Sequence, residues 1–315
     1  LSEWMTNLPM EVKRRPITNI AIPGSHDSFA FSSSLSTALP VANDASSTMV
    51  KAGKIPGVRT FIKRWAVTQN LTISKQLEAG IRYLDLRVSN PPSKHNPENL
   101  LRSAHSLYGA PLLEMIESVK EFLMKHPKEV VLIDMNHLYG FDDELDKIFF
   151  DMINDILGVL SISQLVPAPS NLRPISMYTL EKMQRYGQNV ILIAPFRGES
   201  HPFTDVLWNT NHIRSPWPNS DKIPYIISFL NKLSEERRKD PNPNSLLVYQ
   251  GVATVRGTDI ALHPLSSLEK LLSRSMTKAT CDWLSQRYSR DGINIVIADF
   301  VSSDYSKLVI DVNLR

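Results

Sequence analysis

The sequence predicts an α/β fold, specifically a (β/α) barrel with a parallel sheet, and three observations favour it. Short apolar runs of β type alternate with amphipathic helical segments along the whole chain. No low-complexity linker and no internal repeat divides the chain. Its 315 residues are enough for one barrel-sized domain, although two smaller domains are also possible. We favour a single domain over residues 1–315.

Each expected element follows from its own pattern. Six apolar runs have the length of buried strands, namely residues 17–22, 82–88, 130–135, 190–194, 246–250 and 293–298. Five segments place apolar side chains at helical spacing, namely residues 112–125, 144–157, 177–185, 223–238 and 278–287. The first of these helices is expected to stop at His126 and Pro127.

The composition argues against several classes of function. The chain is 42% hydrophobic and 21% charged, and its net charge of +3 comes without a long Lys/Arg run, so we do not expect nucleic-acid binding. Cys281 is the single cysteine, which excludes an internal disulfide and a Cys-rich zinc site. A single cysteine suits a protein of a reducing compartment, so we expect a cytoplasmic location. No apolar run reaches the roughly 18 residues of a transmembrane helix.

The polar residues that follow apolar runs are the candidates for a functional site. In a (β/α) barrel the chemistry lies at the carboxyl ends of the strands, which all meet at one edge. The residues found there are His26, Asp27, Asp85, Arg87, Asn136, His137, Arg197 and Asp299.

Two of the eight histidines stand out. His26 follows the first apolar run, and His105 follows another short candidate strand in "LLRSAHSLYG". Two imidazoles that titrate near neutral pH suit a reaction at phosphorus, where one group takes a proton from the attacking oxygen and another gives one to the leaving oxygen. Taken singly, each histidine fits a structural, hydrogen-bonded role as well.

A carboxylate beside each imidazole would fix its tautomer. Asp27 and Asp299 lie at two strand ends and are the candidates. Neighbouring side chains on an extended segment point to opposite sides, so we expect Asp27 to turn away from His26 and to reach His105. That leaves His26 for Asp299.

Asp85 and Arg87 lie on one face of the strand in "AGIRYLDLRV". Burying such charges is costly unless they are paired or face a pocket. One interpretation is a structural ion pair. The other is that the guanidinium binds a phosphate oxygen, which suits its planar fork and permanent charge.

A long stretch after the first strand interrupts the alternation. Its basic part, about residues 45–75, contains no acid before Glu78 and interleaves aromatic rings with cations; these side chains are Lys51, Lys54, Arg59, Phe61, Lys63, Arg64 and Trp65. The stretch is either an ordinary solvated excursion or a patch that rests on an anionic membrane surface.

Five motifs, in this order, resemble phosphatidylinositol-specific phospholipase C X domains. They are "IPGSHDSF", "ISKQLEAGIRYLDLRV", "HSLYG", "EVVLIDMNHLYGF" and "INIVIADF". The likeness covers essentially the whole chain. The chain resembles the small proteins that contain this domain alone. It implies an irregular or incomplete (β/α)8 TIM barrel that cleaves the glycerol–phosphate bond of phosphatidylinositol, giving diacylglycerol and a cyclic inositol phosphate.

The resemblance also implies roles for the motif residues. His26 would be the general base and His105 the general acid. Asp299 would orient His26, Asp27 would support His105, and Arg87 would bind the phosphate. The substrate-binding residues expected nearby are Asp85, Asn136, His137 and Arg197.

The same motifs predict that no metal cofactor is used. Calcium-dependent relatives place Asn, Glu, Asp and Glu where this chain has Asp27, Asp85, Arg87 and Met135. Arginine and methionine cannot serve as ligands of an oxygen-coordinated calcium ion. We therefore expect Arg87 to stand in the cation's place, as in the bacterial, metal-independent form.

Other functions remain to be weighed. Glycerophosphodiester phosphodiesterases also use barrels, but their "H-R-G" start and "E-x-D" metal pair are missing from the matching strand ends. Metal-dependent phosphohydrolases need further His and Asp ligands that the sequence does not offer. The alternative from a different class is a phosphoinositide-binding or scaffold protein that has lost turnover on the same barrel.

Overall fold

The computed structural model describes residues 1–315 except 96–99, 142–144, 196–202, 204, 241–242 and 287–291. Its described strands form one sheet. They are β1 (Ile22–Ser25), β2 (Tyr83–Ser89), β3 (Arg102–His105), β4 (Leu107–Pro111), β5 (Val131–Tyr139), β6 (Val190–Ala194), β7 (Leu207–Asn209), β8 (Ile213–Arg214), β9 (Leu246–Gly251) and β10 (Ile295–Ala298).

Eight parallel strands curve into a barrel that stays open at one seam. Their order is β7-β6-β5-β2-β1-β10-β9-β8, and an antiparallel hairpin of β3 and β4 extends from β2. The chain passes from β7 to β8 through the short turn Thr210–His212, and no pairing between these two strands is found in the described part of the chain. The predicted incomplete (β/α)8 barrel is therefore confirmed.

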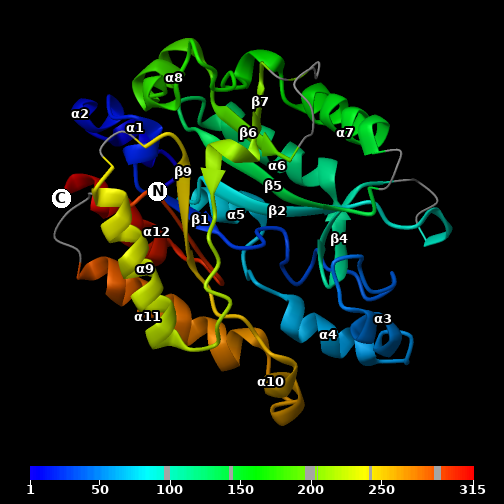
Figure 1. Ribbon diagram of the computed structural model, residues 1–315. Helices are drawn as coiled ribbons and strands as arrows, with labels where there is room; N and C mark the ends of the chain where they lie inside the picture. The colour runs from blue at the N-terminus through cyan, green and yellow to red at the C-terminus, as the bar shows by residue number, and fades with distance from the viewer. Residues whose placement is uncertain (96–99, 142–144, 196–202, 204, 241–242, 287–291) are drawn as a thin grey trace.

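Helices surround this sheet, and a few of them lie near its two ends (Figure 1). At one end lie α1 and α2, and at the other lie α3, α4 and α10. The helices are α1 (Trp4–Asn7), α2 (Met10–Lys13), α3 (Ser47–Ala52), α4 (Val58–Ala66), α5 (Ile73–Glu78), α6 (Leu112–Lys125), α7 (Leu145–Val159), α8 (Leu180–Tyr186), α9 (Ile223–Arg238), α10 (Gly257–Leu262), α11 (Arg274–Ser285) and α12 (Ser303–Asp311). None of the described helices is both long enough and apolar enough to cross a bilayer.

Two layers of hydrophobic core hold the barrel together. Side chains on alternate strand positions fill its interior, among them Ile22, Leu132 and Ile295, and the other face of the sheet packs under the helices. Trp4 and Met5 of α1 belong to the interior cluster, so the N-terminal segment closes the amino end of the barrel. The carboxyl end is thereby left for a site.

The first predicted strand is wrong in its position. Residues 17–22 were expected to be extended, but Ile17–Asn19 form a 3-10 turn and β1 begins only at Ile22. Pro16 precedes the turn, and its carbonyl accepts the Asn19 N–H at 2.8 Å. The run is apolar because Ile17 and Ile20 help to fill the barrel interior, rather than because its backbone is paired in the sheet.

Candidate active site

The pairing of β1 with β10 brings His26 and Asp299 together. Ser25 and Ala298 are register partners in the two parallel strands, and each is followed at once by one of these residues. His26 Nδ1 lies 2.8 Å from Asp299 Oδ1, whose side chain is buried. Because a carboxylate accepts, Nδ1 carries the proton and Nε2 faces the other way. The expected His26–Asp299 pair is thus present.

Asp27 lies between the two histidines. Its Oδ2 is 3.3 Å from His26 Nε2 and 3.4 Å from His105 Nε2. The prediction that Asp27 reaches His105 is confirmed, but the prediction that it turns away from His26 is wrong. The alternation rule fails because the strand has ended: Asp27 has a left-handed backbone with φ of +39°.

Neighbouring groups hold this strained residue in place. Its N–H donates to Asp85 Oδ2 at 2.9 Å, and its carbonyl accepts from Thr68 Oγ1 at 3.0 Å. A left-handed non-glycine residue costs on the order of 1–3 kcal/mol, and such strain gathers at functional sites. The surrounding hydrogen bonds offset that cost and fix the carboxylate between the imidazoles.

His105 is the last residue of β3, at the end of the hairpin strand. Its Nδ1 donates to the carbonyl of Ala66 at 2.7 Å, which leaves Nε2 for the site. The ring centroids of His26 and His105 are 6.2 Å apart, with planes at 77°. Both imidazoles therefore direct Nε2 toward one carboxylate oxygen.

Arg87 adds a cation beside Asp27. Its Nε is 3.1 Å from Asp27 Oδ1, and an Nη lies 3.7 Å from Asp44 Oδ2. Burial would lower the pKa of Arg87, but Asp27, Asp85 and Asp44 raise it above its ordinary value. The Arg87 side chain is still 26% exposed, so solvent reaches part of it.

Asp44 was not predicted as part of the site. It comes from the irregular stretch after β1, and both of its carboxylate oxygens accept the Ser106 N–H, at 2.9 and 3.0 Å. Ser106 follows His105 and has a left-handed φ of +58°. Asp44 thus ties the hairpin to Arg87. No local pattern marks it in the sequence, because its partners come from distant segments.

Asp85 is a buried support for the site rather than an exposed contact. Besides the Asp27 N–H, it accepts a hydrogen bond from Asn136 Nδ2, and it is 5% exposed. A bulge in the pairing of β2 with β5, opposite Leu86 and Arg87, turns Asn136 toward it. Burial and the charge of Asp27 raise the pKa of Asp85.

The remaining predicted contacts lie farther out. His137 is exposed, and its Nδ1 is 2.7 Å from Asn136 Oδ1. Burial and Arg87 lower the pKa of His137. Arg197 lies outside the described residues. Asn136 and His137 therefore form one edge of the site, with His137 as its more accessible part.

The charges in this cluster set the protonation of His26. Burial alone would lower its pKa, but Asp27 and Asp299 raise it to about 9. Burial would raise the pKa of Asp27, but Arg87 and the two histidines lower it to about 2. At neutral pH the cluster thus holds an ionised Asp27 beside an imidazolium and a guanidinium.

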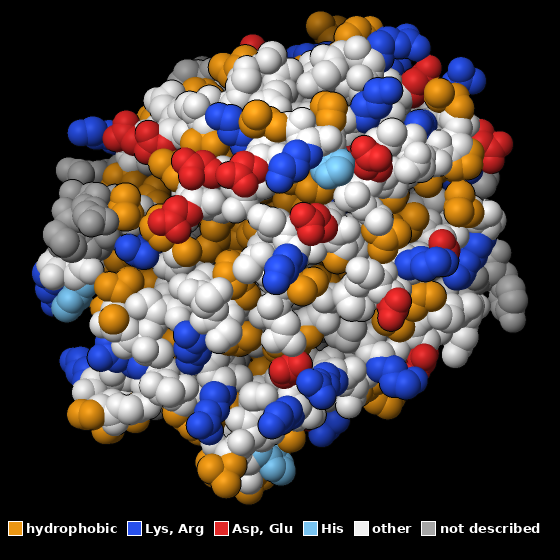
Figure 2. Space-filling model, turned by 180° about the vertical axis from the view of Figure 1, so that it is seen from behind, with side chains coloured by type: hydrophobic (Ala, Val, Ile, Leu, Met, Phe, Trp, Pro, Cys, Tyr) orange, Lys and Arg blue, Asp and Glu red, His pale blue; other side chains and the backbone are white. Residues whose placement is uncertain are grey.

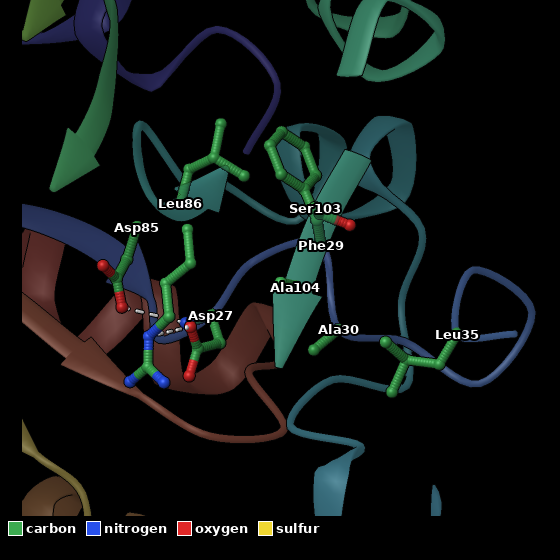
Figure 3. A pocket seen from close by; sticks show the side chains of 9 residues that line it. Asp27, Phe29, Ala30, Leu35, Asp85, Leu86, Ser103 and Ala104 are labelled. Carbon is green, nitrogen blue, oxygen red and sulfur yellow. Dashed lines mark hydrogen bonds and ion pairs between the residues drawn. The ribbon is translucent and has the colours of Figure 1, made fainter. Parts of the chain in front are cut away.

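A small hollow, partly open to solvent, is lined in part by Asp27 and Arg87 (Figure 3). Its other walls are mostly apolar; they are formed by Phe29, Ala30, Leu35, Asp85, Leu86, Ser103 and Ala104. Such walls screen little, so they strengthen the electrostatic interactions of the two charged groups.

His26, Asp27 and Asp85 offer ligand atoms within 4.8 Å of one another, as a metal ion would need. Arg87 lies 3.1 Å from Asp27, however, and both Asp85 oxygens already accept hydrogen bonds. A divalent cation there would face a fixed guanidinium and an imidazole whose raised pKa favours a proton. Metal independence stays a prediction, and this charge pattern supports it.

Comparison with known proteins identifies the family. The chain is 33% identical to mouse PI-PLC X domain-containing protein 2 over an alignment 316 positions long, which covers 99% of this chain and 87% of the relative. It is 32% identical to human PI-PLC X domain-containing protein 3, with 99% and 94% covered. The chain belongs to the PI-PLC X domain-containing proteins. No protein-family model matches it.

Solved structures support the fold of this X-domain chain. A phosphatidylinositol-specific phospholipase C from Listeria monocytogenes superposes with a TM-score of 0.64 at 20% identity, over 98% of this chain and 97% of that one. One from Staphylococcus aureus gives a TM-score of 0.67 at 15% identity, over 98% and 96%. At such identities the likeness is one of fold alone.

Proposed function

We propose that this protein is a phosphodiesterase that cleaves the glycerol–phosphate bond of phosphatidylinositol by general acid–base catalysis. One observation carries the proposal: His26 and His105 direct Nε2 toward the same Asp27 oxygen, at 3.3 and 3.4 Å, beside the partly exposed side chain of Arg87. Two proton carriers and a cation around one point suit an in-line reaction at phosphorus.

Following the family resemblance, we assign one proton transfer to each histidine. Asp299 holds the Nδ1 proton of His26, so His26 Nε2 is the atom that takes the proton of the inositol 2-hydroxyl as its oxygen attacks phosphorus. Ala66 holds the Nδ1 proton of His105, so Nε2 gives its proton to the departing glycerol oxygen. The new P–O bond yields a cyclic inositol phosphate, and the broken one releases diacylglycerol. Arg87 faces the phosphate charge.

The raised pKa of His26 has a consequence for this scheme. With a pKa of about 9, only about 1% of the free protein carries the neutral base at pH 7. The base form is therefore a minor species before substrate enters, and Asp27 is the main group that makes it so.

The test is release of water-soluble inositol phosphate from phosphatidylinositol vesicles in the presence of EGTA. We expect release by the wild-type protein and a loss of about 10²–10⁴-fold in His26→Ala. His95→Ala removes an exposed histidine and should match the wild type. Vesicle binding without release under any metal condition would instead favour the phosphoinositide-binding alternative, and release that requires calcium would contradict metal independence.

We further propose that the edge bearing the site contacts anionic bilayers, but through fewer of the predicted residues. Lys51, Lys54 and Arg64 are exposed. The prediction that Trp65 lies at the lipid surface is wrong. Only 5% of Trp65 is exposed, and its side chain lies on the buried face of α4. The cause is its helical spacing from Ile62, which is buried as well.

The other basic residues are partly committed inside the protein. Arg59 donates to the carbonyls of Ala38 and Leu39 at 2.9 and 2.6 Å, and Lys63 donates to that of Leu35 at 2.7 Å. Phe61 is half-buried. These residues anchor α4 on the loop that follows β1.

Exposed apolar side chains complete the proposed contact. Ile55, after α3, is 59% exposed, and Leu262 and Leu265, at the tip of α10, are 76% and 90% exposed. The lower edge in Figure 2 carries Lys and Arg side chains interspersed with hydrophobic ones. Cations and apolar groups on one edge suit an anionic lipid surface.

This contact is tested by sedimentation with anionic vesicles at low salt. We expect Lys51→Glu with Lys54→Glu to weaken binding by about 30-fold or more, since each reversal loses roughly 1 kcal/mol or more. The matched control is Lys125→Glu with Lys128→Glu, two exposed lysines at the same spacing before β5, on the opposite edge. Equal binding by both double variants would refute the proposed contact surface.

A further inference from the structure

Asp299 uses both of its carboxylate oxygens. Oδ1 pairs with His26, and Oδ2 accepts a hydrogen bond from Ser273 Oγ at 2.6 Å. Its carbonyl oxygen accepts another from Thr277 Oγ1 at 2.8 Å. Side chain and backbone of one residue are thus held by two hydroxyls from a single helical segment.

We infer that Ser273 is a positioning residue for His26, acting through Asp299. Its catalytic consequence rests on the proposed function, whereas the positioning itself does not. No pattern in the sequence marks Ser273, because it lies 26 residues before Asp299 and in no recognisable motif.

Burial makes this hydrogen bond consequential. Ser273 is fully buried and Asp299 is 2% exposed, so water does not readily replace a lost donor. A buried carboxylate oxygen without a donor is strongly disfavoured, so after loss of the Ser273 hydroxyl the charge of Asp299 would depend more on its remaining side-chain donor, the Nδ1–H of His26. Ser273 therefore determines which oxygen remains for the Nδ1 proton of His26.

The local backbone at Ser273 is unusual. Glu269–Ser273 form a π-helical turn in front of α11, and the Arg274 N–H bonds to the Glu269 carbonyl five residues back. Such turns are rare and occur often at functional sites. Ser273 and Thr277 are four residues apart, so they lie on one face of the helix, and that face meets Asp299.

The opposite side of the pair is fixed by another side chain. Gln69 Nε2 donates to the carbonyls of His26 and Ala298, at 2.8 and 3.1 Å. Its neighbour Asn70 donates to Glu269 Oε1 at 3.1 Å, at the start of the π-helical turn. The His26–Asp299 pair is thus clamped between two segments that also bond to each other.

The variant that tests the inference is Ser273→Ala, with Ser273→Thr as the conservative rescue. Thr280→Val is the matched control: Thr280 is also fully buried on α11, but its hydroxyl bonds to the Met276 carbonyl of its own helix at 3.0 Å. Both Ala and Val replacements remove one buried hydroxyl from the same helical segment. Only the first removes a donor from Asp299.

The primary readout is the NMR titration of the His26 imidazole, which requires no substrate. A carboxylate that no longer shares its charge with a hydroxyl attracts the imidazole proton more strongly, so the midpoint should rise by about half a unit or more in Ser273→Ala. We expect Ser273→Thr to restore it and Thr280→Val to leave it unchanged. The inference is overturned if Ser273→Ala titrates like the wild type, or if Thr280→Val shifts the midpoint equally.

Turnover provides a second readout. On phosphatidylinositol vesicles, Ser273→Ala should lower kcat about tenfold with KM unchanged, since one hydrogen bond to a charged group is lost. An inactive wild-type protein whose His26 midpoint still depends on Ser273 would refute the proposed function and keep the positioning role. An active protein whose His26 midpoint does not change in Ser273→Ala would support the proposed function and refute the positioning role.

Discussion

Arg82 and Arg87 lie five residues apart around the same strand, β2, and both contact a buried carboxylate. Arg82 pairs with Glu129 outside the amino end of the barrel, and both side chains are fully buried. Arg87 pairs with Asp27 at the carboxyl end and is 26% exposed. A charge in an apolar strand must be paired within the fold or face a pocket. The Arg82 pair is of the first kind, and the Arg87 pair is of the second kind.

The Arg82 pair is closed. Besides Glu129, its guanidinium donates to the carbonyls of Ser2, Leu77 and Ile81, each at 2.7 Å, and it lies 4.6 Å over the Phe122 ring. Burial outweighs the attraction of Glu129 and lowers the pKa of Arg82 to about 10. Its donors are used within the fold, so this cation joins the N-terminal segment to the barrel and has little left for a ligand.

The Arg87 cluster is open and has an excess of acceptors. Three carboxylates, those of Asp27, Asp85 and Asp44, raise the pKa of the guanidinium, and two imidazoles share the nearest of them. An ion pair by itself therefore says little about function. The informative features are the partial exposure of the Arg87 side chain and the number of titratable groups that converge on Asp27.

Replacing each arginine with lysine gives the sharpest test of this contrast, and Arg87→Lys should have the largest effect. Lysine keeps the charge but loses the planar fork, so we expect phosphodiester cleavage to fall by about 10²–10³-fold. The free energy of unfolding should change by no more than about 1 kcal/mol, because lysine keeps the charge beside Asp27 and the side chain at this position is 26% exposed. Activity on vesicles and urea unfolding measure the two effects; normal turnover would show that Arg87 is only a structural partner.

Arg82→Lys should reverse this pattern. Loss of several buried hydrogen bonds should lower the free energy of unfolding by about 2–4 kcal/mol. Activity per folded molecule should remain at the wild-type level, because no contact links Arg82 to the histidines in the described structure. Urea unfolding with activity normalised to the folded fraction gives the answer. If Arg82→Lys were stable but inactive, Arg82 would also act in catalysis, and its role would not be structural alone.

The sequence predicted the parts of this site that depend on register. Parallel pairing of two strands places His26 beside Asp299 because each follows a paired residue directly. The contact of Asp27 with His26 was missed because the left-handed backbone of Asp27 ends the alternation. Asp44 and Ser273 could not be predicted, since they approach from an irregular stretch and from a π-helical turn.

Trp65 is a different kind of error. Its neighbours Lys63 and Arg64 made the segment resemble a basic surface, yet Ile62, Trp65 and Ala66 follow helical spacing and are all buried. The signal was present in the sequence. Periodicity, rather than the identity of adjacent residues, decides which side of a helix faces water.

Asp134 extends this comparison to a buried carboxylate, and we expect a smaller effect than for either arginine. This carboxylate is 1% exposed inside the barrel, and it accepts from Tyr83 OH at 2.5 Å. Burial, and to a lesser extent the charge of Asp85, raise its pKa to about 7, although Tyr83 opposes this. Asp27 is buried just as deeply, but Arg87 lowers its pKa to about 2. The nearest cation, not depth, separates the two acids.

A pH dependence of stability follows from the raised pKa of Asp134. Between the unfolded value of 3.8 and about 7, the folded state binds a proton that the unfolded chain has lost, so stability falls as pH rises through this window. In Asp134→Asn that loss is absent, and the variant should gain about 1 kcal/mol relative to the wild type for each unit from pH 5 to 7. Urea unfolding at pH 5, 6 and 7 measures the difference.

Asp155→Asn, at an exposed position on α7, serves as the control and should show no such gain. Parallel pH profiles for wild type and Asp134→Asn would mean that Asp134 is ionised in the barrel, and a cation would then have to reach it.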